Sequence, residues 1–68
     1  MKGKIYFDKI IKRRIEMDIT QKDVSEKIGV SLSVIKALET GRSNSSTATL
    51  EKLADLLGLN LNEIYKFN

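Results

Sequence analysis

Three glycines divide the 68-residue chain into short segments, and this division limits the possible folds more than any other feature. Gly29, Gly41 and Gly58 each follow an apolar segment with helical spacing. A glycine just past the end of a helix accepts the left-handed conformation that ends many helices. The absence of proline and the 41% hydrophobic content argue against disorder or a β-rich structure. The pattern therefore predicts an all-α chain of short helices.

Capping patterns mark where the helices begin. Thr20 and Asn60 each precede an acidic residue three positions later, which is the spacing of a capping box. Hydrophobic staples across three helix starts are predicted for the pairs Ile19 and Val24, Val30 and Ile35, and Leu59 and Ile64. Together these signals predict five helices, at Phe7–Glu16, Gln21–Ile28, Leu32–Glu39, Thr47–Leu57 and Leu61–Lys66.

Apolar residues spaced three and four apart predict one core. A chain of this length buries only about 60% of its unfolded surface, so we expect residues 1–68 to form a single domain. The residues expected to point inward are Ile11, Ile15, Val24, Ile28, Val30, Ile35, Leu38, Leu50, Leu53, Ala54 and Leu57.

Two missing residue types exclude most chemistry. The chain has no cysteine and no histidine, which removes disulfides, the usual zinc sites, and thiol or imidazole catalysis. We therefore expect neither an enzyme nor a cofactor. No segment resembles a signal peptide or a membrane span, so we expect a cytoplasmic protein without a membrane partner. The net charge of +3 is compatible with an anionic partner but decides little alone.

The connection between the second and third helices is only Gly29, Val30 and Ser31. It is too short for antiparallel packing and suits helices that cross at roughly 90 to 120°. Ser25 is small where those helices would approach each other. This spacing predicts a helix-turn-helix.

The segment from Thr20 to Ser31, TQKDVSEKIGVS, followed by Ile35 and by LETGR at 38–42, resembles the lambda-repressor/Cro-type (XRE-like) family. The later segments LEKLADLLG at 50–58 and LNEI at 61–64 resemble that family's last two helices, so the resemblance runs from about Phe7 to Tyr65. Departures are Asp18 in place of the usual glycine, Ser25 in place of alanine, and Ser45 in place of proline.

The resemblance implies that the third helix enters the DNA major groove. Lys36 can donate to guanine or to phosphate, Ser33 can bond either kind of base, and an apolar side chain can contact a thymine methyl. Alternatively, Lys36 is a solvated helix position and Leu32 simply packs. The residues predicted to contact bases are Ser31, Leu32, Ser33, Lys36 and Ala37.

Phosphates are expected at helix N-termini and at nearby hydroxyl and amide groups. The stretch from Thr40 to Thr49 contains no acid and one arginine, which favours contacts with the DNA backbone, although a solvated linker is the alternative. Gln21 resembles a family glutamine that bonds phosphate and steadies the third helix. The predicted phosphate contacts are Thr20, Gln21, Arg42, Ser43, Asn44 and Thr47.

Three further expectations concern the remaining residues. Arg14 and Glu39 match family positions that form an ion pair between the first helix and the end of the third. Lys2 and Lys4 are expected in a frayed terminus, with a basic arm near DNA as the alternative. A homodimer is expected because one small module rarely suffices for specific affinity. Its predicted contact residues are Leu61, Ile64, Tyr65 and Phe67.

The sequence thus predicts a regulator of transcription that binds a double-stranded DNA operator as a homodimer, with a repressor favoured and an activator as the alternative. One alternative is the antitoxin of a toxin–antitoxin pair, which would neutralise a toxin partner and repress its own operon. Another is a helical module that binds only protein, which would show no salt-dependent DNA affinity.

Overall fold

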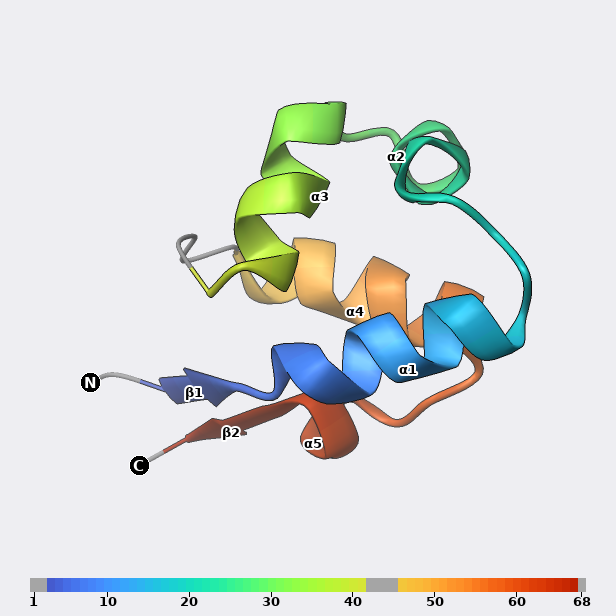
Figure 1. Ribbon diagram of the computed structural model, residues 1–68. Coiled ribbons are helices and arrows are strands. Elements are labelled where there is room, and N and C mark those ends of the chain that lie inside the picture. The colour runs from blue at the N-terminus through green and yellow to red at the C-terminus, as the bar shows by residue number, and fades with distance from the viewer. Residues whose placement is uncertain (1–2, 42–45, 68) are drawn as a thin grey trace.

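The computed structural model describes residues 3–41 and 46–67, which form helices around one core together with two short terminal strands (Figure 1). In chain order the elements are β1 (Gly3–Ile5), α1 (Phe7–Glu16), α2 (Gln21–Ile28), α3 (Leu32–Glu39), α4 (Thr47–Leu57), α5 (Leu61–Ile64) and β2 (Tyr65–Phe67).

Local signals account for the helix boundaries. Thr20 and Asp23 form the predicted capping box: the Asp23 N–H donates to Thr20 Oγ1 over 3.0 Å, and the Thr20 N–H donates to Asp23 Oδ2 over 2.9 Å. Gly29 ends α2 at φ 74° and Gly58 ends α4 at φ 70°, both in the left-handed region. The first four helices begin and end where the sequence predicts, although no side chain caps the start of α1.

The C-terminal end differs from the prediction. The helix expected over Leu61–Lys66 stops at Ile64, and Tyr65 continues as extended backbone into β2. This strand pairs antiparallel with β1, with Lys4 opposite Lys66 and Ile5 opposite Tyr65. Lys4 is thus in a strand, and the expectation of a frayed terminus is wrong for it. Lys2 lies outside the described residues.

The first helix also presents a different inward face. Ile10 is 1% exposed, whereas Ile15, expected in the core, is 63% exposed. Ile11, also expected in the core, is half-buried and lies outside it. Arg14 lies four residues after Ile10, so it shares the inward face and reaches the end of α3. That orientation turns Ile15 to the outside. The buried apolar core consists of Ile10, Val24, Ile28, Ile35, Leu38, Leu50, Leu53, Ala54, Leu57 and Ile64.

The packing leaves one side of α3 uncovered. α4 contacts α1, α2 and α5, whereas α3 packs mainly against α1 and α2 at the edge of the helical cluster. Figure 1 shows α2 and α3 at the top and the paired strands at the lower left. Within the described segments, every helix is too short or too polar to cross a membrane.

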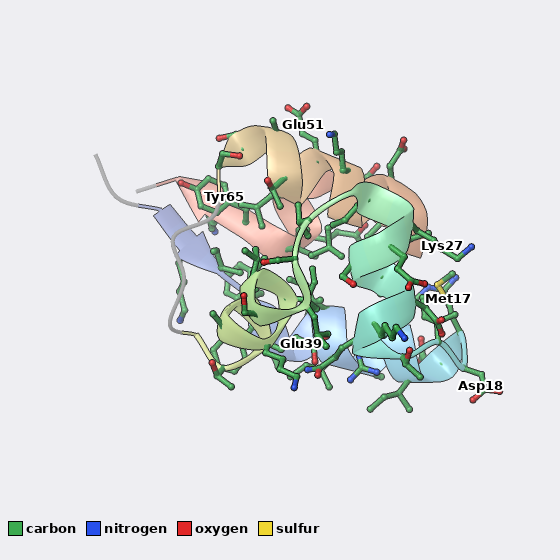
Figure 2. The ribbon with its side chains drawn as sticks, turned by 90° about the horizontal axis from the view of Figure 1, so that it is seen from above. Met17, Asp18, Lys27, Glu39, Glu51 and Tyr65 are labelled. Atoms are coloured by element: carbon green, nitrogen blue, oxygen red, sulfur yellow. The ribbon has the colours of Figure 1, made fainter. Side chains whose placement is uncertain are left out.

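The turn between α1 and α2 contains a strained residue. Asp18 has φ 56° and lies at the periphery of the molecule (Figure 2). A left-handed residue with a Cβ costs about 1–2 kcal/mol, less for aspartate, whereas glycine accepts this conformation freely.

We expect Asp18→Gly to raise the free energy of unfolding by about 0.5–1 kcal/mol, because relief of the strain outweighs the added flexibility of the unfolded chain. Asp18→Ala is the matched variant, and it should be less stable than Asp18→Gly. Urea denaturation of both variants measures the difference. Equal stability of the two would contradict the assignment of strain to this turn.

Candidate nucleic-acid interface

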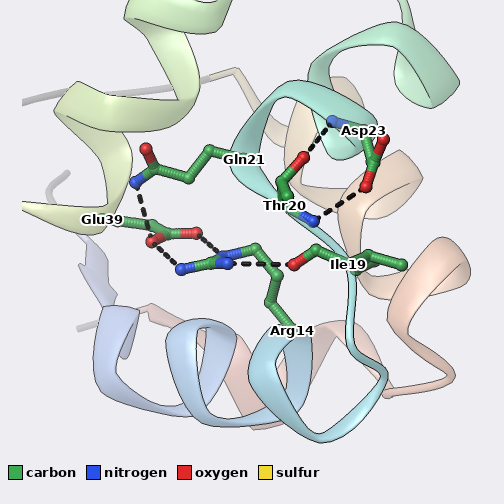
Figure 3. A network of polar contacts seen from close by, with 6 residues as sticks. All are labelled: Arg14, Ile19, Thr20, Gln21, Asp23 and Glu39. Atoms are coloured by element: carbon green, nitrogen blue, oxygen red, sulfur yellow. Dashed lines mark hydrogen bonds and ion pairs between the residues drawn. The ribbon is translucent and has the colours of Figure 1, made fainter.

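A buried polar network joins α1, α2 and α3 at one point (Figure 3). Arg14 donates from Nε to Glu39 Oε2 over 2.7 Å and from Nη2 to Glu39 Oε1 over 3.1 Å. Its Nη1 donates to the carbonyl oxygen of Ile19 over 3.0 Å. Gln21 Nε2 donates to Glu39 Oε1 over 3.0 Å. The last residue of α3 is therefore bonded to both neighbouring helices.

Because this network is buried, its distances and angles can vary little without loss of stability. The Glu39 side chain is 5% exposed and the Arg14 side chain is 16% exposed. A charge removed from water is tolerated only when it is paired and its remaining hydrogen-bonding groups are satisfied. The planar guanidinium supplies two parallel donors to the carboxylate, which fixes direction as well as distance. The pair thus sets how α3 is oriented on α1.

The uncovered side of α3 carries the residues predicted to contact bases. Ser31, Ser33 and Lys36 are exposed, and Leu32 and Ala37 are half-buried. Their neighbours Ile35 and Leu38 are 1% exposed and point into the core. The Ser31 and Ser33 hydroxyls lie 3.1 Å apart at the start of the helix. The structure therefore gathers hydroxyl, ammonium and small apolar groups on one accessible helix face.

Capping hydroxyls lie at the N-termini of the surrounding helices. Thr20 caps α2 and is exposed, and its hydroxyl accepts from the Asp23 N–H. Ser46 caps α4, accepting from the Thr49 N–H over 3.2 Å, and exposed Thr47 follows it. The sequence analysis did not name Ser46 as a helix cap, although its three-residue spacing to Thr49 is a capping signal.

The other predicted phosphate contacts lie partly inside and partly outside the described residues. Gln21 is half-buried and its amide nitrogen bonds Glu39, so it acts first within the network, with one amide hydrogen left over. Arg42, Ser43 and Asn44 lie outside the described residues.

The residues predicted at a dimer contact do not form one exposed patch. Ile64 is 0% exposed and belongs to the core, so its assignment to a dimer surface is wrong. Leu61 and Tyr65 are half-buried and pack against that core. The Phe67 backbone pairs with Gly3, and its side chain lies outside the described part of the structure. Of the described side chains in this set, Leu61 and Tyr65 retain some accessible surface for a partner.

The surface of α4 and α5 carries a groove, unlike the exposed helix face of α3. A shallow groove there mixes charged, polar and apolar side chains, and no three acidic side chains within residues 3–41 and 46–67 are grouped to hold a metal ion. The groove is lined by Ala48, Glu51, Lys52, Ala54, Asp55, Leu59, Asn60 and Leu61.

Comparison with known proteins assigns the central part of the chain. A helix-turn-helix family model matches residues 10–64. No curated protein matches the chain. The matched segment begins within α1, ends with α5, and contains both the network and the exposed face of α3. Strands β1 and β2 lie outside it.

Removal of the Glu39 carboxylate should be strongly destabilising. We expect Glu39→Ala to lower the free energy of unfolding by about 3–5 kcal/mol, because it leaves the buried Arg14 charge unpaired. Glu39→Gln keeps an acceptor and should cost less. The matched control is Glu51→Ala at an exposed position of α4, expected within about 0.5 kcal/mol of the wild type. Urea denaturation reports all three, and a Glu39→Ala protein as stable as the control would refute the role of the network.

The start of α2 should be sensitive to acid. The N–H and hydroxyl of Thr20, bonded to the Asp23 carboxylate, hold the pKa of that carboxyl below its usual range, and Lys27 and Lys22 add to the effect. A lowered pKa gives stability that is present above the ordinary aspartate value of about 4 and is lost as pH falls through the lowered pKa.

We therefore expect Asp23→Asn to be less stable than the wild type at neutral pH, with the difference shrinking as the solution is acidified below the ordinary aspartate pKa. Thermal unfolding followed by circular dichroism across this range provides the measurement. A difference that stays constant with pH would contradict the assigned role of the carboxylate.

Proposed function

The chain belongs to this helix-turn-helix family, of the XRE and lambda-repressor type, whose members are DNA-binding transcriptional regulators, and we propose that it recognises a specific duplex sequence with α3 in the major groove. A major groove about 12 Å wide admits one α-helix, and its base edges are distinct for each base pair. A helix can contact these base edges only if one of its faces is not covered by the rest of the protein.

The exposed face of α3 is the observation that supports this proposal. Lys36 and Ser33 are accessible on that face, while Glu39 holds the far end of the same helix to α1 and α2. Side chains on a fixed helix can be matched to base edges at a lower entropic cost than side chains on a mobile loop. The proposed contacts are Lys36 to guanine O6 and N7, Ser33 to a base edge, and Leu32 or Ala37 to a thymine methyl.

Backbone contacts would position the helix in the groove. Thr20 and Thr47 lie at the first turns of α2 and α4, where unpaired amides and the helix dipole attract anions. We assign Arg42, Ser43 and Asn44, which follow α3 in the sequence, to the same role, with the remaining Gln21 amide hydrogen. Such contacts set register and affinity but carry no sequence information.

We also propose that the protein binds DNA as a dimer and represses transcription. One module buries about 600–1,000 Å² on DNA, less than most specific complexes, so two copies on adjacent half-sites would supply the affinity. Half-sites about 34–36 Å apart place both copies of α3 on one side of the duplex. A protein seated in the groove of a promoter excludes polymerase from that DNA. We therefore propose a homodimeric repressor.

The experiment that tests the proposal starts with selection of bound fragments from a random duplex library, followed by fluorescence anisotropy on the selected and on unrelated DNA. We expect a specific sequence to emerge, and binding to weaken as salt rises. Failure to enrich any sequence, with no affinity for duplex DNA in dilute buffer, would overturn the proposal.

Two substitutions separate base contacts from phosphate contacts. Lys36→Ala should weaken binding to the selected sequence by about 1–3 kcal/mol and leave unrelated DNA nearly unaffected. Arg42→Ala should weaken binding to both DNAs alike, because it removes a phosphate contact. Equal losses on both DNAs for Lys36→Ala would reject its assignment to a base.

A further inference from the structure

The terminal strands form a small sheet with two different faces. Ile5 and Tyr65 are direct partners in the ladder, and both pack against the hydrophobic core. Lys4 and Lys66 are the next pair, and both are exposed. Because successive side chains of a strand point to opposite faces, the lysine pair lies on the outer face. The sheet therefore attaches to the core by one face and presents positive charge on the other.

The lysine pair is unfavourable within the protein itself. Residues directly opposite in an antiparallel ladder have Cβ atoms about 4.5–5.5 Å apart, and like charges there are destabilising. Two three-residue strands supply little pairing energy to offset this repulsion. A marginal sheet that carries two facing ammonium groups gains stability when an anion binds between or beside them.

A third ammonium group adds to the same cluster. The Lys4 Nζ lies 5.5 Å from the centre of the Tyr6 ring, and the Lys9 Nζ lies 5.9 Å from it. One aromatic ring thus gathers two cations from β1 and α1. Among the described residues, the ion pairs are Arg13 with Glu16 and Arg14 with Glu39, so no acid is within ion-pair distance of this cluster. Lys4, Lys9 and Lys66 define the terminal lysine cluster.

The terminal lysine cluster lies beside the end of α3. A Cβ added to Gly41, the second residue after α3, would be 3.3 Å from the Phe7 ring. Phe7 is the residue after Tyr6, whose ring contacts two lysines of the cluster. Phe7 itself lies close to Gly41, the residue before Arg42. Figure 1 shows β1 and β2 extending toward the same side of the molecule as the C-terminal end of α3. The Phe7 contact therefore connects the part of the chain that carries the cluster to the end of the proposed DNA-binding helix.

From this arrangement we infer that the terminal lysine cluster is a second phosphate-binding site, which contacts the duplex backbone beyond the bases that α3 contacts. The inference rests on the proposed function and extends it. All three lysines lie outside residues 10–64, the segment that matches the family model, and two of them are on β1 and β2, so the cluster depends on this chain's own termini. Lysine ammonium groups on an ordered sheet and helix are presented together, and each phosphate they neutralise releases counterions.

The test measures how DNA affinity depends on salt. The variant is Lys4→Gln with Lys66→Gln, and the matched control is Lys27→Gln with Lys52→Gln, which lowers the net charge of +3 by the same two units. Lys27 and Lys52 are exposed residues of α2 and α4, and Lys27 lies on the opposite side of the view from Tyr65 in Figure 2. The probe is a mixed-sequence duplex several helical turns long, titrated by anisotropy at several salt concentrations.

We expect the slope of log K against log salt to become less steep by about 0.9 for each lysine–phosphate pair that the substitutions remove, and the control slope to match the wild type. Circular dichroism should give the Lys4/Lys66 variant a melting temperature no lower than the wild type, because the like-charge pair is gone. Lys9→Gln, on the surface of α1, gives the same test if the double variant fails to fold.

The outcomes separate the two proposals. A wild-type slope in the Lys4/Lys66 and Lys9 variants, or the same reduction in the control, would overturn the lysine site while leaving α3 as the DNA-binding helix. A wild-type protein without duplex affinity would instead overturn the proposed function.

Discussion

Glu39 brings a negative charge into the interior where α1, α2 and α3 meet, and each of the other two helices supplies a donor to hold it. The burial of Ile35 and Leu38 decides which side of α3 faces the core, but apolar contacts are not directional. The two parallel bonds from Arg14, with the bond from Gln21, are directional and span three helices. This one carboxylate therefore fixes how the end of α3 is held against α1 and α2.

The parts of the structure that depend on local chemistry could be predicted from the sequence. The capping box at Thr20 and Asp23 and the glycines after α2 and α4 act within a few residues, so the helix bounds follow from spacing alone. The exposure of Ser33 and Lys36 follows from the same periodicity. Pairing between residues distant in the sequence could not be predicted in this way: β1 and β2 join the two ends of the chain, and no local signal marks Tyr65 as extended.

The errors at Ile15 and Ile64 have a shared physical origin. Helical spacing places Ile15 inside because isoleucine is apolar, but the bond from Arg14 to Glu39 fixes the rotation of α1 and turns Ile15 outward. Ile64 is expected at a surface because it lies near the end of the chain, yet the strand that follows it folds back and leaves it fully buried. In both cases a contact between distant residues outweighs the local preference.

The network holds the end of α3 to α1 and α2, and we propose that the outward face of this helix contacts a duplex groove. The most direct measurement is the change in backbone amide chemical shifts of the isotope-labelled protein when a duplex selected for binding is added. The account predicts that the largest changes fall between Ser31 and Ala37, with others at Thr20 and Thr47. Largest changes along the α4–α5 groove, at Glu51 and Asp55, with α3 unaffected, would contradict it.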